Sequence, residues 1–182
     1  MSEDELDRMC VERCLHGDAA AFEEILDRYE KPVFNAIVRF GADREEARDL
    51  SQQVFLKIFE RLDTYDPSRK FFSWLYRVAI NETINHMKAH RAWEPLSDAL
   101  EYRHPTAQEE LEASESEHDM QEALLALDPK YRLALIVRHF LDLSYEEAAD
   151  VLSIPVKTVK SRLFTARQML RGIIEGRRHA AR

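Results

Sequence analysis

The chain has 182 residues, a formal net charge of −8, and only four glycines, six prolines and two cysteines. An acidic chain is not expected to coat nucleic acid non-specifically, and two cysteines form no disulfide framework. No apolar run reaches the roughly 18 residues of a membrane span, and the start Met1-Ser2-Glu3-Asp4-Glu5 lacks the features of a signal peptide. Scarce glycine and long amphipathic patterns predict an all-α, cytoplasmic protein without membrane insertion.

The charge is unevenly distributed along the chain. Residues 31–91 hold 11 Lys and Arg against 8 Asp and Glu, and residues 126–182 hold 11 against 6. Residues 1–30 are acidic, as are residues 92–122. Two mildly basic blocks separated by an acidic tether indicate two DNA-facing modules. Neither block is basic enough for tight DNA binding by itself, because affinity follows the number of phosphates neutralised.

The first block predicts a series of amphipathic helices. Residues 21–39 form one helix or two, with Pro32 as a kink or a break, and residues 41–43 are a stop-and-restart signal. The helix predicted over 44–62 buries its apolar stripe, which includes Phe55, and leaves four polar residues largely available: Asp49, Gln52, Gln53 and Lys57. Residues 65–68 are a turn, and further helix continues to about residue 91.

Residues 69–91 interleave five basic side chains with four aromatic ones and a single acid, Glu82. This composition suits unpaired DNA, because cations follow the backbone while aromatic faces accept unstacked bases. Aromatic residues at helical spacing are more often core, and Trp74, Leu75 and Val78 are predicted to be so.

The second half of the chain begins with a predicted linker. Residues 92–119 combine prolines, serines and glutamates without a sustained apolar period, as linkers do. Residues 120–141 are helical, with a new helix starting at Asp128-Pro129.

Residues 143–162 predict a helix-turn-helix. Ser144 and Glu147 form a capping box for its first helix, and Pro155 suits the start of its second helix. From there five apolar residues share one side at helical period, with Ser161 pointing directly away from them: Val156, Val159, Leu163, Ala166 and Leu170. The opposite, polar and basic face can hydrogen-bond base edges and meet phosphates.

The cysteine and histidine residues give only weak evidence of a metal or redox site. Cys10 and Cys14, with His16 nearby, could form a metal or redox switch, but Leu6, Cys10 and Cys14 also share one helical face, as packing residues do. His86 and His90 are i,i+4 neighbours without the acidic residue of a zinc-binding motif. We expect no metal, cofactor or catalytic residue.

Four stretches in order resemble the sigma-70 family of bacterial RNA polymerase sigma factors, in its extracytoplasmic-function group. They are Asp18–Glu23, Ala47–Lys57, Phe72–Asn81 and Leu143–Leu170. The resemblance implies a sigma region 2 bundle over 1–91, a flexible acidic linker over 92–119, a sigma region 4 helix-turn-helix over 120–176 and a basic tail over 177–182. It implies a sigma factor that carries no enzyme activity of its own. Its partners would be core RNA polymerase (the β′ clamp helices and the β flap), promoter DNA and an anti-sigma factor.

The resemblance also implies three sets of site residues. The polymerase-binding set is Asp49, Gln52, Gln53, Phe55 and Lys57. The set for the melted −10 element is Arg69, Lys70, Phe71, Trp74, Tyr76, Arg77, Asn81 and Lys88. The set for the −35 element is Lys157, Thr158, Lys160, Ser161, Arg162, Phe164, Thr165 and Arg167.

The chain departs from the family pattern at two positions. Thr165 stands where the family often has arginine, so the −35 base preference is expected to differ. Ser153 stands where it often has glycine, at a modest cost to the turn. The competing hypotheses are a stand-alone repressor or activator, which would bind duplex DNA without polymerase, and a helical enzyme or metal sensor built on the Cys and His residues.

Overall fold

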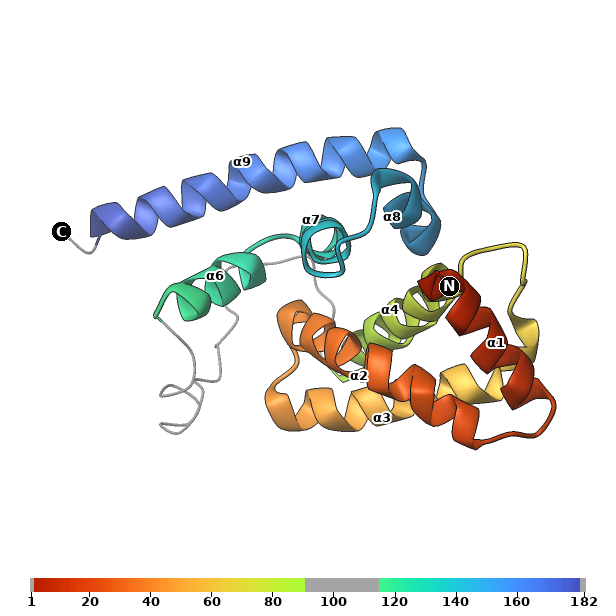
Figure 1. Cartoon of the computed structure of the whole chain (residues 1–182). Helices are drawn as coiled ribbons and strands as arrows, with labels where there is room; N and C mark the ends of the chain where they lie inside the picture. Colours follow the sequence, from red (N-terminus) through yellow and green to blue (C-terminus); the bar gives the residue numbers. More distant parts are fainter. Residues whose placement is uncertain (1, 91–114, 181–182) are drawn as a thin grey trace.

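The computed structural model describes residues 2–90 and 115–180, which form two packed groups of helices without strands (Figure 1). The N-terminal domain comprises α1 (Glu3–Leu15), α2 (Ala20–Phe40), α3 (Arg44–Glu60), the short 3₁₀ helix η1 (Leu62–Thr64) and α4 (Phe71–His90). The C-terminal domain comprises α6 (Glu115–Leu125), α7 (Pro129–Leu135), the π-helical turn η2 (Ile136–Phe140), α8 (Tyr145–Leu152) and α9 (Val156–Ala180). Within these residues no helix is both long and apolar enough to cross a membrane.

Local sequence signals account for most helix ends. The Ser2 hydroxyl accepts from the Glu5 amide in a capping box that starts α1. Gly41, at φ 122°, ends α2, and the Asp43 carboxylate caps α3. Asp128 caps α7 ahead of Pro129, which occupies the first turn. The predicted boundaries at residues 41–43 and 128–129 are therefore confirmed.

The structure differs from the predicted elements in three places. Pro32 lies inside one uninterrupted helix, α2. Helix α6 begins at Glu115, inside the predicted linker, since acidic residues are favoured in the first turn of a helix. Helix α9 extends to Ala180, so most of the predicted basic tail is helical. The rest of the predicted linker, residues 92–114, lies outside the described residues.

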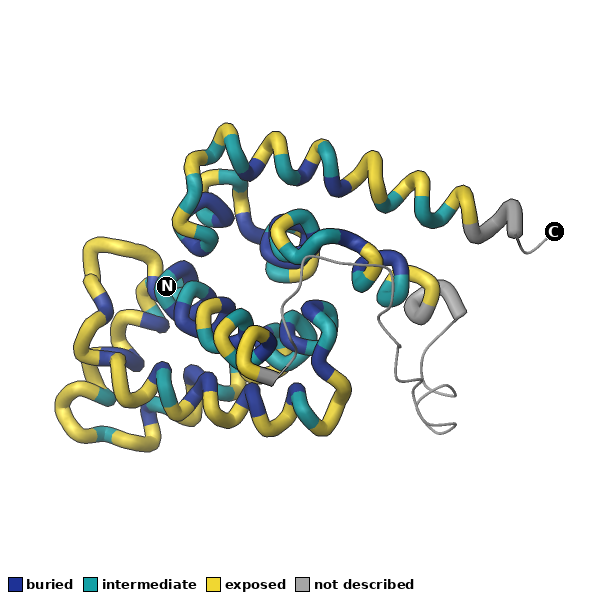
Figure 2. The backbone as a smooth tube through the Cα atoms, turned by 180° about the vertical axis from the view of Figure 1, so that it is seen from behind, coloured by how far each residue is buried: buried dark blue, intermediate teal, exposed yellow. Residues whose placement is uncertain are grey.

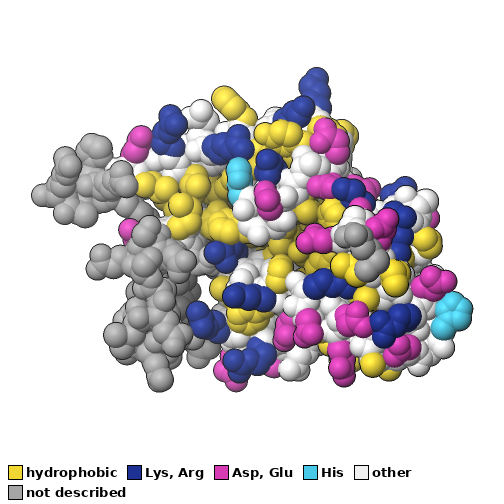
Figure 3. Space-filling model, in the orientation of Figure 1, with side chains coloured by type: hydrophobic (Ala, Val, Ile, Leu, Met, Phe, Trp, Pro, Cys, Tyr) yellow, Lys and Arg dark blue, Asp and Glu magenta, His cyan; other side chains and the backbone are white. Residues whose placement is uncertain are grey.

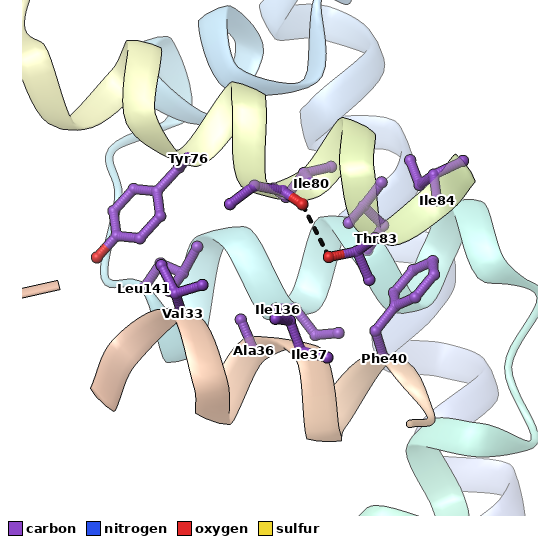
Figure 4. A pocket seen from close by; sticks show the side chains of 12 residues that line it. Val33, Ala36, Ile37, Phe40, Tyr76, Ile80, Thr83, Ile84, Ile136 and Leu141 are labelled. Atoms are coloured by element: carbon purple, nitrogen blue, oxygen red, sulfur yellow. Dashed lines mark hydrogen bonds between the residues drawn. The ribbon is translucent and has the colours of Figure 1, made fainter. Parts of the chain in front are cut away.

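The two domains meet along an apolar seam. Val33, Ile37 and Phe40 of α2 face Ile136 and Leu141 of the C-terminal domain, and α4 contributes Tyr76 and Ile80 (Figure 4). A cavity of about 20 Å³ remains there, which is room for about one water molecule. Viewed from outside, hydrophobic side chains form a band between the upper and lower parts of the molecule (Figure 3). The seam is therefore close to fully packed.

Polar contacts close the seam at the end of α2. The guanidinium of Arg132, which is buried, donates to the carbonyl of Phe40 at 2.6 Å and to the carbonyls of Leu125 and Leu127. The Gln121 side chain donates to the Val38 carbonyl at 2.8 Å. The last carbonyls of a helix have no partner within it, so the C-terminal domain supplies donors that α2 lacks.

Candidate nucleic-acid interface

Helices α8 and α9 form the predicted helix-turn-helix. The Ser144 hydroxyl accepts from the Glu147 amide at 3.1 Å, and the Glu147 carboxylate accepts from the Ser144 amide at 2.8 Å. Ser153 adopts the left-handed conformation at φ 53° and ends α8. The Pro155 carbonyl accepts from the Thr158 and Val159 amides, and α9 begins at Val156. The capping box and the proline at the turn are confirmed.

The two faces of α9 divide as the periodicity predicts. Val159, Leu163 and Ala166 are buried against α7 and α8, and buried and exposed positions alternate along the helix (Figure 2). All eight residues of the −35 set lie outside the core, and Phe164 is 66 % exposed. An exposed ring amid lysines, arginines and hydroxyls makes a face that can contact both base edges and phosphates.

Two cations of this face touch aromatic or imidazole groups at its edge. The Lys160 ammonium lies 5.3 Å from the centre of the Tyr145 ring. Arg167 Nη2 lies 3.1 Å from His139 Nε2. Burial and the positive charges of Arg167 and Arg138 lower the pKa of His139. A neutral imidazole accepts a hydrogen bond from Arg167, so the two groups can stay adjacent without repulsion.

The predicted −10 set divides into a surface group and a core group. Arg69, Lys70, Asn81 and Lys88 are exposed, and Arg77 and Trp74 are half-buried. Phe71 and Tyr76, by contrast, are 1 % and 7 % exposed. Burial of these two rings in this conformation disfavours the predicted contact of Phe71 and Tyr76 with DNA.

An aromatic cluster explains the burial of these rings. The Phe71 ring lies 5.2 Å from that of Tyr65 and 5.7 Å from that of Trp74, and the Tyr76 ring lies 5.9 Å from that of Tyr29. The Tyr65 hydroxyl donates to the Arg69 carbonyl at 2.6 Å. Such contacts hold the turn before α4 against α2. The aromatic rings therefore support the turn that carries Arg69 and Lys70.

Three cations of the −10 set contact acidic residues of α8. Lys70 Nζ lies 2.6 Å from Glu147 Oε1, and Arg69 Nη1 lies 3.3 Å from Asp150 Oδ1. Arg77 Nη2 lies 2.8 Å from Asp150 Oδ1, and the same guanidinium donates to the Asp150 carbonyl. This contact could not be predicted from the sequence, since nothing local in the chain relates segments about 75 residues apart.

The ionisation of the Lys70–Glu147 pair reflects the contact. The hydrogen bond to Glu147 raises the pKa of Lys70. Burial raises the pKa of Glu147, but donors from Lys70 and Ser144 outweigh it, so the net pKa of Glu147 is lowered. Both groups are therefore charged at neutral pH.

Helix α3 presents most of the predicted polymerase-binding set. Asp49, Gln52 and Gln53 are exposed, and Lys57 is half-buried, 3.5 Å from Glu60. Phe55 is 5 % exposed and packs in the core, which disfavours its predicted contact with polymerase. Its place in the apolar stripe of the helix is the physical reason.

Two apolar residues on α3 were missed. Leu56 and Phe59 are 64 % and 49 % exposed. They follow Asp49 and Gln52 at steps of three or four residues, which keeps them on one helical face. That spacing was the available signal, and exposed apolar groups beside polar ones are typical of an interface.

The cysteines are engaged in packing. The buried Cys10 thiol lies 3.3 Å from Glu24 Oε2 and 3.2 Å from Arg28 Nη2. Burial raises the pKa of both Cys10 and Cys14, which disfavours the reactive thiolate. Across residues 2–90 and 115–180 no three His, Cys, Asp or Glu side chains gather as a metal site would require.

Comparisons with known proteins match both halves of the chain. The family model "Sigma-70 region 2" matches residues 25–93, and "Sigma-70, region 4" matches residues 117–170. The RNA polymerase sigma-H factor of Pseudomonas aeruginosa is 34 % identical, with 91 % of this chain and 92 % of that protein covered. The ECF RNA polymerase sigma-E factor of Escherichia coli K12 is 31 % identical, with 93 % and 95 % covered.

Solved structures are similar over both domains. CnrH, in complex with the cytosolic domain of CnrY, superposes with a TM-score of 0.75 at 26 % identity and covers 94 % of this chain and 98 % of its own. The sigma factor RpoE of Bartonella quintana, in complex with the anti-sigma factor NepR, has the same fold with a TM-score of 0.69 at 22 % identity, over 85 % and 96 % of the two chains. With a close match along nearly its whole length and both signature regions in order, the chain belongs to the sigma-70 family of RNA polymerase sigma factors, in its extracytoplasmic-function group.

Proposed function

We propose that this sigma factor directs core RNA polymerase to promoters through two DNA-reading surfaces. Helix α9 reads the −35 element as duplex, and the turn before α4 together with α4 reads the −10 element as a melted strand. The observation that carries the proposal is the presence, in one chain, of two cationic helical surfaces on separate domains, next to a third surface on α3 that is polar and apolar. None of the three requires a catalytic residue.

The −35 assignment rests on the exposed face of α9. Lys160, Ser161 and Phe164 are exposed in the N-terminal half of α9, the part of a recognition helix that contacts base edges in the major groove. Lys157, Arg162 and Arg167 flank them and suit phosphates. Thr158 and Thr165, both half-buried, complete the set.

The −10 assignment rests on Arg69, Lys70, Arg77, Asn81 and Lys88. Cations follow the backbone of the melted strand, and the Asn81 amide can hydrogen-bond an exposed base edge. We assign base stacking to Phe72 and Trp74, whose rings are half-buried, because Phe71 and Tyr76 are buried. The Lys70 ammonium already lies 5.3 Å from the centre of the Phe72 ring, so cation and ring can act together on one nucleotide.

The polymerase assignment rests on α3. Asp49, Gln52 and Gln53, joined by Leu56 and Phe59, offer polar and apolar contacts to the β′ clamp helices, and the C-terminal domain would bind the β flap. Gln52 also borders a groove of about 330 Å³ between α2 and α3. A helix of the polymerase that binds α3 could also contact this groove.

An anti-sigma factor is the proposed regulator. The sigma factor of Bartonella quintana was solved with one, and the exposed apolar side chains of α3 suit a second protein partner as well as polymerase. Because polymerase and chromosomal DNA lie in the cytoplasm, the proposed site of action is there.

Transcription in vitro tests the proposal. Purified core polymerase should initiate from a distinct subset of a promoter library only when this chain is added. Lys160→Ala should change the −35 bases selected, at a cost of about 1–3 kcal/mol in discrimination, and leave polymerase binding unchanged. Asp49→Lys should weaken binding to core polymerase without changing which promoters are chosen.

Lys130→Ala is the matched control for the DNA face. It removes an exposed lysine from α7, outside α9, and should leave promoter choice unchanged. Absence of promoter-specific initiation by the wild-type chain would overturn the proposal. Loss of polymerase binding in Lys160→Ala would show that the faces are assigned wrongly.

A further inference from the structure

A histidine of the π-helical turn η2 contacts a cation of the −35 set. His139 Nε2 lies 3.1 Å from Arg167 Nη2, and both side chains are exposed. Arg167 follows Lys160 and Phe164 at steps of three or four residues, so the three share one face of α9. His139 therefore borders the face of α9 that we assign to the −35 element.

The contact requires one protonation state of the imidazole ring. A guanidinium carries donors only, so His139 Nε2 must accept the hydrogen bond from Arg167. The ring accepts at Nε2 only when it is neutral and its proton lies on Nδ1. Protonation of Nε2 would bring two donors and two positive charges together, so the contact would be lost.

The surroundings of His139 favour the neutral ring. Burial lowers the pKa of His139 from its ordinary value of 6.5, and the charges of Arg167 and Arg138 act in the same direction, against Asp142. Other charged or titratable groups on the elements packed against η2 have partners of their own: Arg39 of α2, Lys130 and Arg132 of α7, and Tyr145, Glu147 and Asp150 of α8. The imidazole is therefore neutral at pH 7 and can hold Arg167.

We propose that His139 is a positioning residue for the −35 element, which as a neutral acceptor holds the Arg167 guanidinium at the edge of the α9 face. The inference rests on the proposed function in assigning Arg167 to DNA. An arginine that is already ordered loses less rotamer entropy when it meets a phosphate. His139, a residue outside α9, thus contributes to the affinity for the −35 element.

The proposed role gives DNA binding a pH dependence of definite sign. As pH falls through the lowered pKa of His139, the imidazole becomes a cation and Arg167 loses its acceptor. Affinity for the −35 element then falls. A histidine that paired with a phosphate itself would behave in the opposite way, because DNA would favour the protonated ring and affinity would rise at acid pH.

Promoter binding across a range of pH tests this role. The probe is a fluorescent promoter duplex selected in the transcription assay, titrated between about pH 8 and pH 5 at constant salt with core polymerase that carries the full chain. His139→Gln keeps an acceptor that does not titrate, whereas His139→Leu removes the acceptor. The matched control is His16→Gln, the same exchange at an exposed histidine that ends α1 in the other domain.

We expect the wild type and His16→Gln to lose affinity about two- to fivefold relative to His139→Gln at the acid end of the range, since an exposed hydrogen bond contributes little. At pH 8, His139→Leu should bind more weakly than His139→Gln by a similar factor. Arg167→Ala should remove the difference between the two variants, because their effect acts through Arg167. Parallel pH profiles for the wild type and His139→Gln, or a relative gain of affinity by the wild type at acid pH, would overturn the inference.

The pair itself is tested without DNA or polymerase. In the full chain, an NMR titration of the His139 ring should give a lower pKa in the wild type than in Arg167→Ala, because that substitution removes a positive charge and the donor to Nε2. An equal pKa in the two chains would overturn the inference even if the chain directs polymerase to promoters. Failure of the proposed function would be seen separately, as absence of promoter-specific initiation by the wild type at pH 8.

Discussion

Individual residues in unfavourable states mark where this chain departs from the simplest helical design. Ser153 has a positive φ of 53°, a conformation that disfavours any residue with a Cβ atom. Asp7 is a fully buried carboxylate at the contact of α1 with α2. For each of these two residues, we predict the direction in which a substitution changes the stability of the protein.

Ser153→Gly should stabilise the protein by about 0.5–1 kcal/mol, because glycine adopts the left-handed conformation without steric cost. Urea unfolding followed by far-ultraviolet circular dichroism measures the change. Ser161→Gly is the contrasting control: it lies inside α9 and should destabilise by about 0.5 kcal/mol. A loss of stability in Ser153→Gly would mean that the serine side chain itself holds the turn.

Asp7 gives stability a pH dependence of unusual sign. Burial raises the pKa of Asp7 above 3.8, although the Tyr29 hydroxyl, which donates at 2.6 Å, and the Arg28 guanidinium act in the opposite direction. The folded state therefore binds a proton more readily than the unfolded state. The free energy of unfolding falls as pH rises from the ordinary pKa of Asp7 through its raised pKa in the folded state. Relative to Asp7→Asn, the wild type should gain stability as pH falls from 7 toward about 4.

Asp18 supplies the control of opposite sign. The hydrogen bond from Arg13 lowers the pKa of Asp18, so its contribution is present above the ordinary value and is lost as pH falls through the lowered one. Compared with Asp18→Asn, the wild type should therefore lose stability at acid pH. Urea unfolding of the three chains at several pH values decides the matter, and parallel pH profiles for wild type and Asp7→Asn would contradict the assignment.

At the scale of elements, local chemistry predicts where helices begin and end. The capping box of Ser144 and Glu147 and the end of α2 at Gly41 each depend on residues that are close together in the sequence. The apolar stripe of α9 likewise predicts its buried face. Such signals act within one or two turns, so they survive in the folded protein.

Other parts of the site could not be predicted, since they depend on what each helix packs against. The composition of residues 69–91 suits unpaired DNA but does not say which rings stay exposed, and Tyr29 and Tyr65 hold Tyr76 and Phe71 in the core. Phe55 was placed in the polymerase-binding set because of the family resemblance, although its position in the apolar stripe of the helix predicts that it is buried. Glu147 had a sufficient local role as a cap, and its second role toward Lys70 depends on tertiary contact alone.

For the whole molecule, the buried guanidinium of Arg132 joins the two domains. It donates to the carbonyl of Phe40 in α2, to that of Leu125 at the end of α6 and to that of Leu127 after it, and these groups lose this donor if Arg132 is removed. A buried polar group without a partner costs about 1–3 kcal/mol. The domains are thus linked by more than their apolar seam.

Arg132→Met should therefore destabilise the protein by about 2–4 kcal/mol, measured by urea unfolding. Arg132→Lys should recover only part of that loss, because an ammonium cannot reproduce the fork of the guanidinium. Arg138→Met is the matched control: Arg138 lies 3.5 Å from the well-exposed Asp142 and should cost under about 1 kcal/mol. Equal losses for the two methionine variants would argue against a special role for Arg132.

The π-helical turn η2 changes the direction in which the chain leaves α7. The Leu141 amide donates to the Ile136 carbonyl five residues earlier, so this turn holds one residue more than an α-helical turn. One extra residue offsets the direction of the following chain by about 100°. The chain therefore leaves α7 in a different direction before Asp142, whose positive φ of 51° belongs to the loop that leads to α8.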